Sequence, residues 1–269
     1  MTAKKIRRCV IPALVLLFLY VPILILALYS FTDATQIGAI RSFTFKNYVT
    51  LFTTEELRSM IFGTIILALV SAALATLLGT LGAIGSFYSK KRVSSLMGTV
   101  NQIPVINADV VTGFSLCILL VVVFGIGKDT YIPLVIGHVT LCAPFVYLSV
   151  IPKLKQMDPA LYEAALDLGA TPAKALFRVV IPQILSGMIS GFSLAITLSL
   201  DDYFIATYTK PATFDTISTY VVNATRGSQT SIKTALWALS TLIFLLVILL
   251  VVLMNVKAGR AEKKGERAP

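Results

Sequence analysis

Charged and metal-binding side chains are scarce in this chain. Only 13% of its 269 residues are charged, and it has a single histidine, His138. Its three cysteines, Cys9, Cys117 and Cys142, stand far apart with no CxxC pair among them. A lone histidine excludes any two-histidine metal site, and scattered cysteines do not match the spacing of a zinc site. We therefore expect no metal site and three unpaired thiols.

The sequence also lacks a nucleotide-binding loop. The closest candidate is Gly125-Ile126-Gly127-Lys128-Asp129, which has no upstream glycine at the required spacing and no Ser or Thr after its lysine. A phosphate-binding loop needs both features. No nucleophile paired with a base is visible either. We therefore expect no catalytic residues, no cofactor and no ATP hydrolysis by the chain itself.

Apolar sequence is what the chain has in abundance. Hydrophobic residues make up 57% of it, and its mean hydropathy is +0.86. Crossing a bilayer takes about 20 apolar helical residues, and backbone amides in lipid must bond within the helix. The composition predicts an all-α, polytopic membrane protein of about six transmembrane helices, forming a single domain over residues 1–269. The expected spans are 9–31, 60–88, 103–125, 131–151, 183–208 and 232–256.

Lysine and arginine are divided unevenly by these spans. Sixteen of the 23 lie at the two ends of the chain and after the second and fourth spans, and seven lie in the alternate segments. By the positive-inside rule, both termini are then cytoplasmic. The first span follows a basic start like that of a signal peptide, but it is too long and lacks a cleavage site, so we expect a retained anchor. The net charge of +10 therefore indicates orientation in membrane lipid, and no nucleic-acid partner is expected.

Residues 152–182, between the fourth and fifth spans, carry the start and stop signals of two short helices. Asp158-Pro159 and Thr171-Pro172 each combine a capping side chain with a proline at the first helical position. Gly169, between them, suits the left-handed residue that ends a helix. These signals are equally compatible with a loop resting on the membrane surface and with a docking site for another protein.

The same segment resembles a known signature. It reads Glu163-Ala164-Ala165, then Gly169, then Val179, Ile181 and Pro182. This order is similar to the cytoplasmic loop of permease subunits of bacterial ATP-binding-cassette importers, although the family more often has Ile and Leu where Val179 and Ile181 stand. The resemblance implies a type I importer permease fold in the bacterial inner membrane, in which residues 152–182 form the coupling loop. It implies that Glu163, Ala164, Ala165 and Gly169 contact an ATPase subunit.

Three further stretches are similar to the second permease of spermidine/putrescine importers: residues 43–48, 103–109 and 198–202. The likeness covers nearly the whole chain, and Ser-Leu-Asp-Asp at 199–202 is its least general part. It implies half of a translocation path for a small cationic substrate. The implied partners are a second permease subunit, two ATP-binding subunits and an extracytoplasmic substrate-binding protein.

Carboxylates inside the expected spans are candidate substrate contacts, because a charge in hydrocarbon is expensive and must face protein or water. Asp109 lies about 6 residues into its span, or roughly 9 Å at the helical rise, in the inner half of the membrane. Asp201 and Asp202 lie deep in the fifth span, nearer the outer face. We hypothesise that all three line the path and that the ring of Tyr203 adds cation–π attraction.

Structural alternatives remain open for each of these residues. Asp109 fits equally the start of a helix at Val110, and His138 is expected to be a satisfied packing residue. The Gly187-xxx-Gly191 face is expected to pack within the chain. Asp201 and Asp202 fit a hydrated helix end that pairs with a cation, for which the candidates are Lys210, Arg226 and Lys233.

Two rival functions also remain open. One is an importer permease of the same architecture for an anion or a metal ion. The other is an ion-coupled carrier that works alone, although such carriers often show matched halves, and no such pair is evident here.

Overall fold

The computed structural model describes residues 3–34, 42–158, 160–226 and 230–265. These residues are built from helices, with an isolated bridge pairing Thr32 and Phe43. The chain groups into two compact units. The first joins Met1–Ser59 to Tyr220–Ile248, and the second joins Met60–Thr219 to Leu249–Pro269. That residues 1–269 act as a single transmembrane domain stays a prediction.

The helices follow the expected spans, with bounds of their own. They are α1 (Ala3–Ser30), α2 (Lys46–Thr53), α3 (Glu55–Tyr88), α4 (Lys91–Ile106), α5 (Asp109–Cys117), η1 (Ile118–Val123), α6 (Ile132–Gln156), α7 (Ala160–Asp167), α8 (Pro172–Ala175), η2 (Leu176–Val180), α9 (Ile181–Asp201), α10 (Phe204–Thr209), α11 (Ile217–Arg226) and α12 (Thr230–Gly265). Five are long and apolar enough to cross a membrane, and a bent pair makes a sixth span. The predicted all-α membrane fold is confirmed.

The third expected span, 103–125, is wrong as a single helix. α4 ends at Ile106 and α5 begins at Asp109, with a bend of 102° between α4 and the pair α5–η1. Asn107 takes an extended backbone conformation, and its Nδ2 donates a hydrogen bond of 3.0 Å to Thr112 Oγ1. Such a local side-chain bond competes with helix continuation. The fifth expected span, 183–208, is likewise interrupted, because the backbone at the C-cap of α9 is extended.

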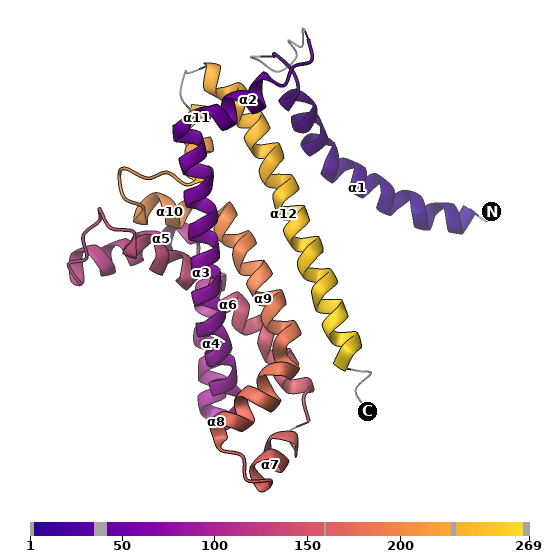
Figure 1. The fold of residues 1–269 in the computed structure, drawn as a ribbon, viewed down its shortest axis with the longest axis vertical. Coiled ribbons are helices and arrows are strands. Elements are labelled where there is room, and N and C mark those ends of the chain that lie inside the picture. The colour runs from indigo at the N-terminus through magenta and orange to yellow at the C-terminus, as the bar shows by residue number, and fades with distance from the viewer. Residues whose placement is uncertain (1–2, 35–41, 159, 227–229, 266–269) are drawn as a thin grey trace. The chain divides into compact units, whose positions relative to one another are not determined.

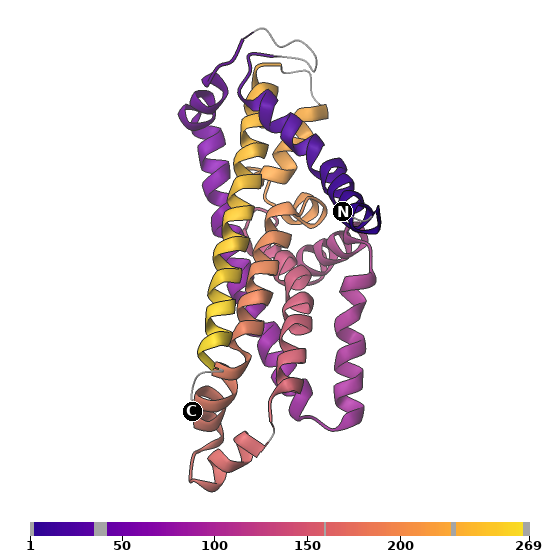
Figure 2. The same ribbon diagram turned by 90° about the vertical axis from the view of Figure 1, so that its right-hand side faces the viewer.

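Small residues bring α6 and α9 close together in the second unit (Figure 2). A Cβ on Gly187 would lie 2.9 Å from the Ser149 carbonyl oxygen, and one on Gly191 would lie 3.1 Å from Val146 Cα. Only glycine permits this approach of two backbones. The prediction that this Gly-xxx-Gly face packs within the chain is confirmed. Cys142, buried in the same region, is a free thiol.

In the first unit, a buried asparagine joins the end of α1 to α2. Asn47 Nδ2 donates to the carbonyl oxygens of Ser30 (3.0 Å) and Thr32 (2.8 Å). The last carbonyls of a helix have no partner inside it, so a side-chain donor there satisfies them. Tyr48 Oη is 2.8 Å from Ser30 Oγ, and its ring lies 5.0 Å from that of Phe31. The stretch 43–48 therefore has a structural role.

Replacing Asn47 with leucine is expected to destabilise this junction. Leucine has the same branching at Cγ but donates nothing, and a buried carbonyl left unpaired costs about 1–3 kcal/mol. We expect the melting temperature of the detergent-purified protein to fall by several degrees in a thermal unfolding scan. Lys46→Leu, at the exposed neighbouring position, is the control and should change little. An equal loss in both variants would contradict the assignment.

Candidate functional site

The segment between α6 and α9 forms a helical hairpin at one end of the second unit (Figures 1 and 2). Asp158 Oδ1 accepts a hydrogen bond of 2.9 Å from the Ala160 amide at the start of α7. Thr171 Oγ1 accepts one of 3.4 Å from the Lys174 amide at the start of α8. Both predicted capping side chains are confirmed, whereas Pro159 lies outside the described residues.

The helix α7 ends in a Schellman turn centred on Gly169. This residue has a φ of +83°, in the left-handed region. Its amide donates to the Leu166 carbonyl (2.8 Å), and the Ala170 amide donates to the Ala165 carbonyl (3.0 Å). These two bonds define the motif and reverse the chain direction. The stop signal predicted at Gly169 is therefore confirmed, and it sets the angle between α7 and α8.

The hairpin presents apolar side chains beside an acidic one. Leu168 is 89% exposed and Phe177 is 69% exposed. Glu163 and Ala164 are exposed on α7, and Ala165 is half-buried. Large apolar side chains grouped on a surface indicate contact with another molecule. This surface suits a protein partner, because small, acidic and apolar side chains alternate over a short distance.

The predicted acidic residues lie at the two breaks in the membrane helices. Asp109 is the first residue of α5 and Asp201 is the last residue of α9, and both are exposed. The helix α10 packs against α5, where a Cβ on Gly113 would lie 3.0 Å from Ile205 Cα. Tertiary packing therefore brings the two helix breaks together, although they are far apart in the sequence.

The three carboxylates form one cluster. The charges of Asp109 and Asp201 both act on Asp202. The prediction that Asp109 lies apart from the other two is therefore wrong, whereas its depth in the membrane stays a prediction. The helix before it begins at Lys91 instead of Ile103, and α4 alone is about 24 Å long at 1.5 Å per residue. Asp109 and the pair Asp201 and Asp202 thus form one acidic region instead of two separate charged positions along the path.

Asp202 is buried and caps α10. Its Oδ1 accepts a hydrogen bond from the Ile205 amide (3.2 Å), and its Oδ2 accepts one from the Ala206 amide (2.7 Å). The first amides of a helix have no partner inside it, so the carboxylate stabilises the start of α10. Tyr203, next along the chain, is half-buried. Of the acidic pair, the exposed carboxylate is that of Asp201.

His138 of α6 is a buried neighbour of Asp202 that the sequence did not assign to it. Its Nδ1 lies 3.1 Å from the Leu134 carbonyl, which can only accept, so Nδ1 carries a hydrogen in this bond. Its Nε2 has no hydrogen-bond partner among the described residues and lies 3.8 Å from Asp202 Oδ2. His138 was predicted to be a packing residue with its hydrogen bonds satisfied, and among the described residues this holds for Nδ1 but not for Nε2.

The cation partners considered for the acidic pair are not seen. Lys210 Nζ lies 2.9 Å from Asp215 Oδ1 and donates to the Phe214 carbonyl at 2.9 Å. The side chains of Arg226 and Lys233 lie outside the described part of the chain. Lys210 is thus held within its own loop, and Asp202 has His138 of α6 as its neighbour instead.

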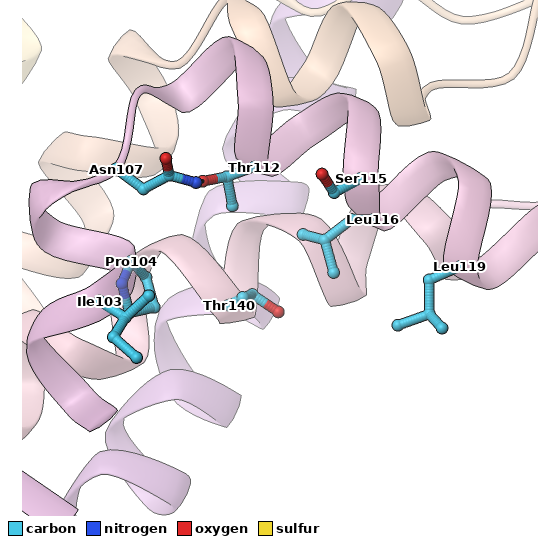
Figure 3. Close-up of a pocket in the computed structure, with 8 residues that line it drawn as sticks. All are labelled: Ile103, Pro104, Asn107, Thr112, Ser115, Leu116, Leu119 and Thr140. Carbon is cyan, nitrogen blue, oxygen red and sulfur yellow. The ribbon is translucent and has the colours of Figure 1, made fainter.

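A cavity of about 230 Å³ lies beside the break between α4 and α5 (Figure 3). The side chains of Asn107 and Thr112 point toward each other in the close-up, and Thr140 of α6 approaches from the other side. The lining residues are Ile103, Pro104, Asn107, Thr112, Ser115, Leu116, Leu119 and Thr140. Asn107 and Thr112 bond to each other, and Thr140 Oγ1 donates to the Ile136 carbonyl at 2.8 Å, so the wall that faces the cavity is mainly apolar.

Comparison with known proteins gives the chain a family. The profile of the binding-protein-dependent transport system inner membrane component matches residues 75–261. The chain is 32% identical over 266 residues to the putrescine transport system permease protein PotI of Escherichia coli (strain K12). The aligned region covers 97% of this chain and 93% of the relative. It is 29% identical over 236 residues to the spermidine/putrescine transport system permease protein PotC of Haemophilus influenzae, covering 88% and 90%.

Solved structures agree on the fold. A bacterial ABC transporter involved in the import of the acidic polysaccharide alginate matches with a TM-score of 0.71 at 17% identity, over 95% of each chain. An amino acid ABC transporter solved with histidines matches with a TM-score of 0.56 at 16% identity, over 80% of this chain and 96% of the other. The predicted importer permease fold is thus confirmed. Since the family profile covers most of the sequence, the chain belongs to the family of binding-protein-dependent transport system inner membrane components.

Proposed function

We propose that this chain is a permease subunit of an ATP-driven importer of polyamines, with spermidine or putrescine as cargo. The names of the relatives support the cargo. A second permease subunit would complete the path, two ATP-binding subunits would supply energy, and an extracytoplasmic binding protein would deliver substrate. The alginate transporter was solved in complex with a substrate-bound periplasmic protein, which supports the last of these partners.

The exposed hairpin is the observation that carries this proposal. Its surface offers Glu163, Ala164, Ala165 and Gly169 to an ATPase subunit, on a loop whose caps hold it rigid. From the hairpin, one continuous helical segment, Pro172–Asp201, leads to the acidic cluster. At 1.5 Å per residue this segment is about 45 Å long, so a displacement at the ATPase is transmitted to the helix break.

The orientation follows from charge. Lys153, Lys155, Lys174 and Arg178 flank or lie within the hairpin. The positive-inside rule supports a cytoplasmic hairpin and cytoplasmic termini, because the order of the expected spans assigns the hairpin and the basic ends of the chain to the same side. The hairpin would then be accessible to a cytoplasmic ATPase.

Uptake of radiolabelled putrescine and spermidine, in cells lacking their own polyamine importers, tests the proposal. Asp109→Asn and Asp201→Asn should each lower uptake about fivefold, the size expected for loss of one exposed ion pair. Asp129→Asn removes one exposed charge outside the cluster and should leave uptake near the wild-type rate. All variants should still co-purify with their partner subunits.

Transport measurements with other solutes and with the purified chain separate the rival functions. Uptake of an anion or metal ion without polyamine uptake would replace the cargo but keep the importer. Transport by the purified chain alone, without nucleotide, would instead favour an ion-coupled carrier. Unchanged polyamine uptake in both Asp variants would remove the acidic cluster from the path.

A further inference from the structure

A second cavity, of about 500 Å³, lies in the second unit between the end of α3, α4 and α6. Lys91, Ser94 and Ser95, in the first turns of α4, line one end together with Lys155, in the last turn of α6. Deeper residues include the apolar Leu148. The cavity, here called the basic groove, is therefore cationic at one end, and its further walls carry the apolar Leu148 and Ile151 together with the polar Gln102.

The two lysines of the basic groove have no counter-ion of their own. Among the described residues, neither Lys91 nor Lys155 forms an ion pair, and both are exposed. Lys90 and Arg92 add two more charges at the same end. Clustered basic residues at the ends of membrane helices attract anionic headgroups. The basic side chains at this end of the groove thus favour the binding of an anion.

The walls of the basic groove are tied together by hydroxyl groups. Tyr147 Oη donates to Ser86 Oγ at 2.9 Å, and Ser86 Oγ is 3.2 Å from Ser94 Oγ. These contacts link α6, α3 and α4, and both Tyr147 and Ser86 are buried. Because three helices are fixed by one chain of hydrogen bonds, the groove is formed before any ligand arrives.

The length and surroundings of the basic groove indicate what occupies it. From Lys91 to Gln102 it follows α4 for about 16 Å at the helical rise, long enough for part of an acyl chain. Apolar side chains of α4 are exposed outside it, with Val93 at 45% and Leu96 at 63%. A free phosphate would gain nothing from the apolar part. We propose that the basic groove binds one anionic phospholipid, with its phosphate between Lys91 and Lys155 and an acyl chain along Leu148.

Native mass spectrometry of the full chain, purified from membranes with the subunits that accompany it, tests this assignment. With added phosphatidylglycerol, the wild-type protein should retain one lipid more than the Lys91→Gln/Lys155→Gln variant. Loss of two charge-assisted contacts should weaken that binding at least tenfold, on the order of 1.4 kcal/mol or more. Lys46→Gln/Lys128→Gln removes the same charge from residues that do not line the groove and should retain the lipid.

A second variant keeps the lysines and fills the groove. A Cβ on Gly98 meets nothing closer than Tyr147 Oη at 3.9 Å, so Gly98→Leu projects into the cavity without a backbone clash. It should also lose the bound phosphatidylglycerol. Millimolar inorganic phosphate should not displace the lipid from the wild-type protein.

Four results would overturn the proposal. Equal retention of phosphatidylglycerol by the wild type and the double lysine variant would show that the groove does not hold it. Equal retention of phosphatidylcholine would show no preference for an anion, and displacement by inorganic phosphate would indicate an anion site without a lipid tail. A cross-link from Ser95→Cys to another subunit, with no lipid bound, would assign the groove to a protein partner.

Discussion

Replacing Gly169 with valine is expected to reduce polyamine uptake more than tenfold while the membrane spans stay folded. The residue has a φ of +83°, and a β-branched side chain in the left-handed region is disfavoured by roughly 1–2 kcal/mol or more. No atom lies within 4 Å of the added Cβ, so the effect acts through the backbone. The Schellman turn should open, and α7 should no longer hold Glu163 in place. Uptake and co-purification of the ATPase subunits measure both consequences.

The chain offers a matched control for this substitution. Gly125 also has a left-handed φ, of +67°, and open space around it, but it lies in the loop after η1. Gly125→Val therefore introduces similar strain away from the hairpin and should leave ATPase binding intact. Gly169→Asn should recover part of the activity, since asparagine tolerates this conformation. Full transport by Gly169→Val would show that the hairpin does not transmit energy.

The second large effect is expected from Asp202→Leu, and it should act through stability. The substitution removes the acceptor of the Ile205 and Ala206 amides, and hydrogen bonds to a charged group contribute about 1.5–3 kcal/mol each. It also leaves His138 Nε2 without its acidic neighbour. We expect the melting temperature to fall by several degrees and uptake to fall with it, because α10 separates from the end of α9.

Two variants separate this structural role from a role of charge. Asp202→Asn keeps one acceptor oxygen and should lie between the wild type and the leucine variant in thermal unfolding. Asp201→Leu removes the exposed carboxylate next to it and should lower uptake with little change in melting temperature. If Asp202→Leu unfolds at the wild-type temperature, the capping role is wrong and a direct contact with substrate becomes the better account.

We propose that these two sites move together. The helical segment Pro172–Asp201 runs without a break from the hairpin to the position where Asp202 caps α10. A rigid cap at this point moves α10 with α9, and α10 packs against α5 at the other helix break. Gly169→Val and Asp202→Leu therefore act at the two ends of the same helical segment, Pro172–Asp201.

Local chemistry made the hairpin predictable. Asp158, Thr171 and Gly169 act on amides and carbonyls within a few residues of themselves, so their pattern in the sequence is enough to identify the turns. The interruption at Asn107 carried a weaker signal. Pro104 and an asparagine inside an apolar run indicate a possible break, but the hydropathy of the segment favoured an uninterrupted span.

Contacts between distant residues were not predictable in this way. Asn47 donates hydrogen bonds to carbonyls at the end of α1. His138 of α6 lies near Asp202, which follows α9. Single residues of these types occur in many settings, and nothing in the sequence states which of them are buried together. The separation of Asp109 from Asp201 and Asp202 was wrongly predicted for a related reason, because it depends on where the preceding helix begins.

The sequence by itself determined the membrane-spanning helical class, the number of spans and the capped hairpin, because hydrophobic length and capping act over short stretches of chain. Only the tertiary structure decided that the two helix breaks meet, that Asp202 is a buried cap beside His138, and that Lys91 and Lys155 share a groove. These features depend on which helices pack together. Packing is set by the summed contacts of many side chains, and no local pattern encodes that sum.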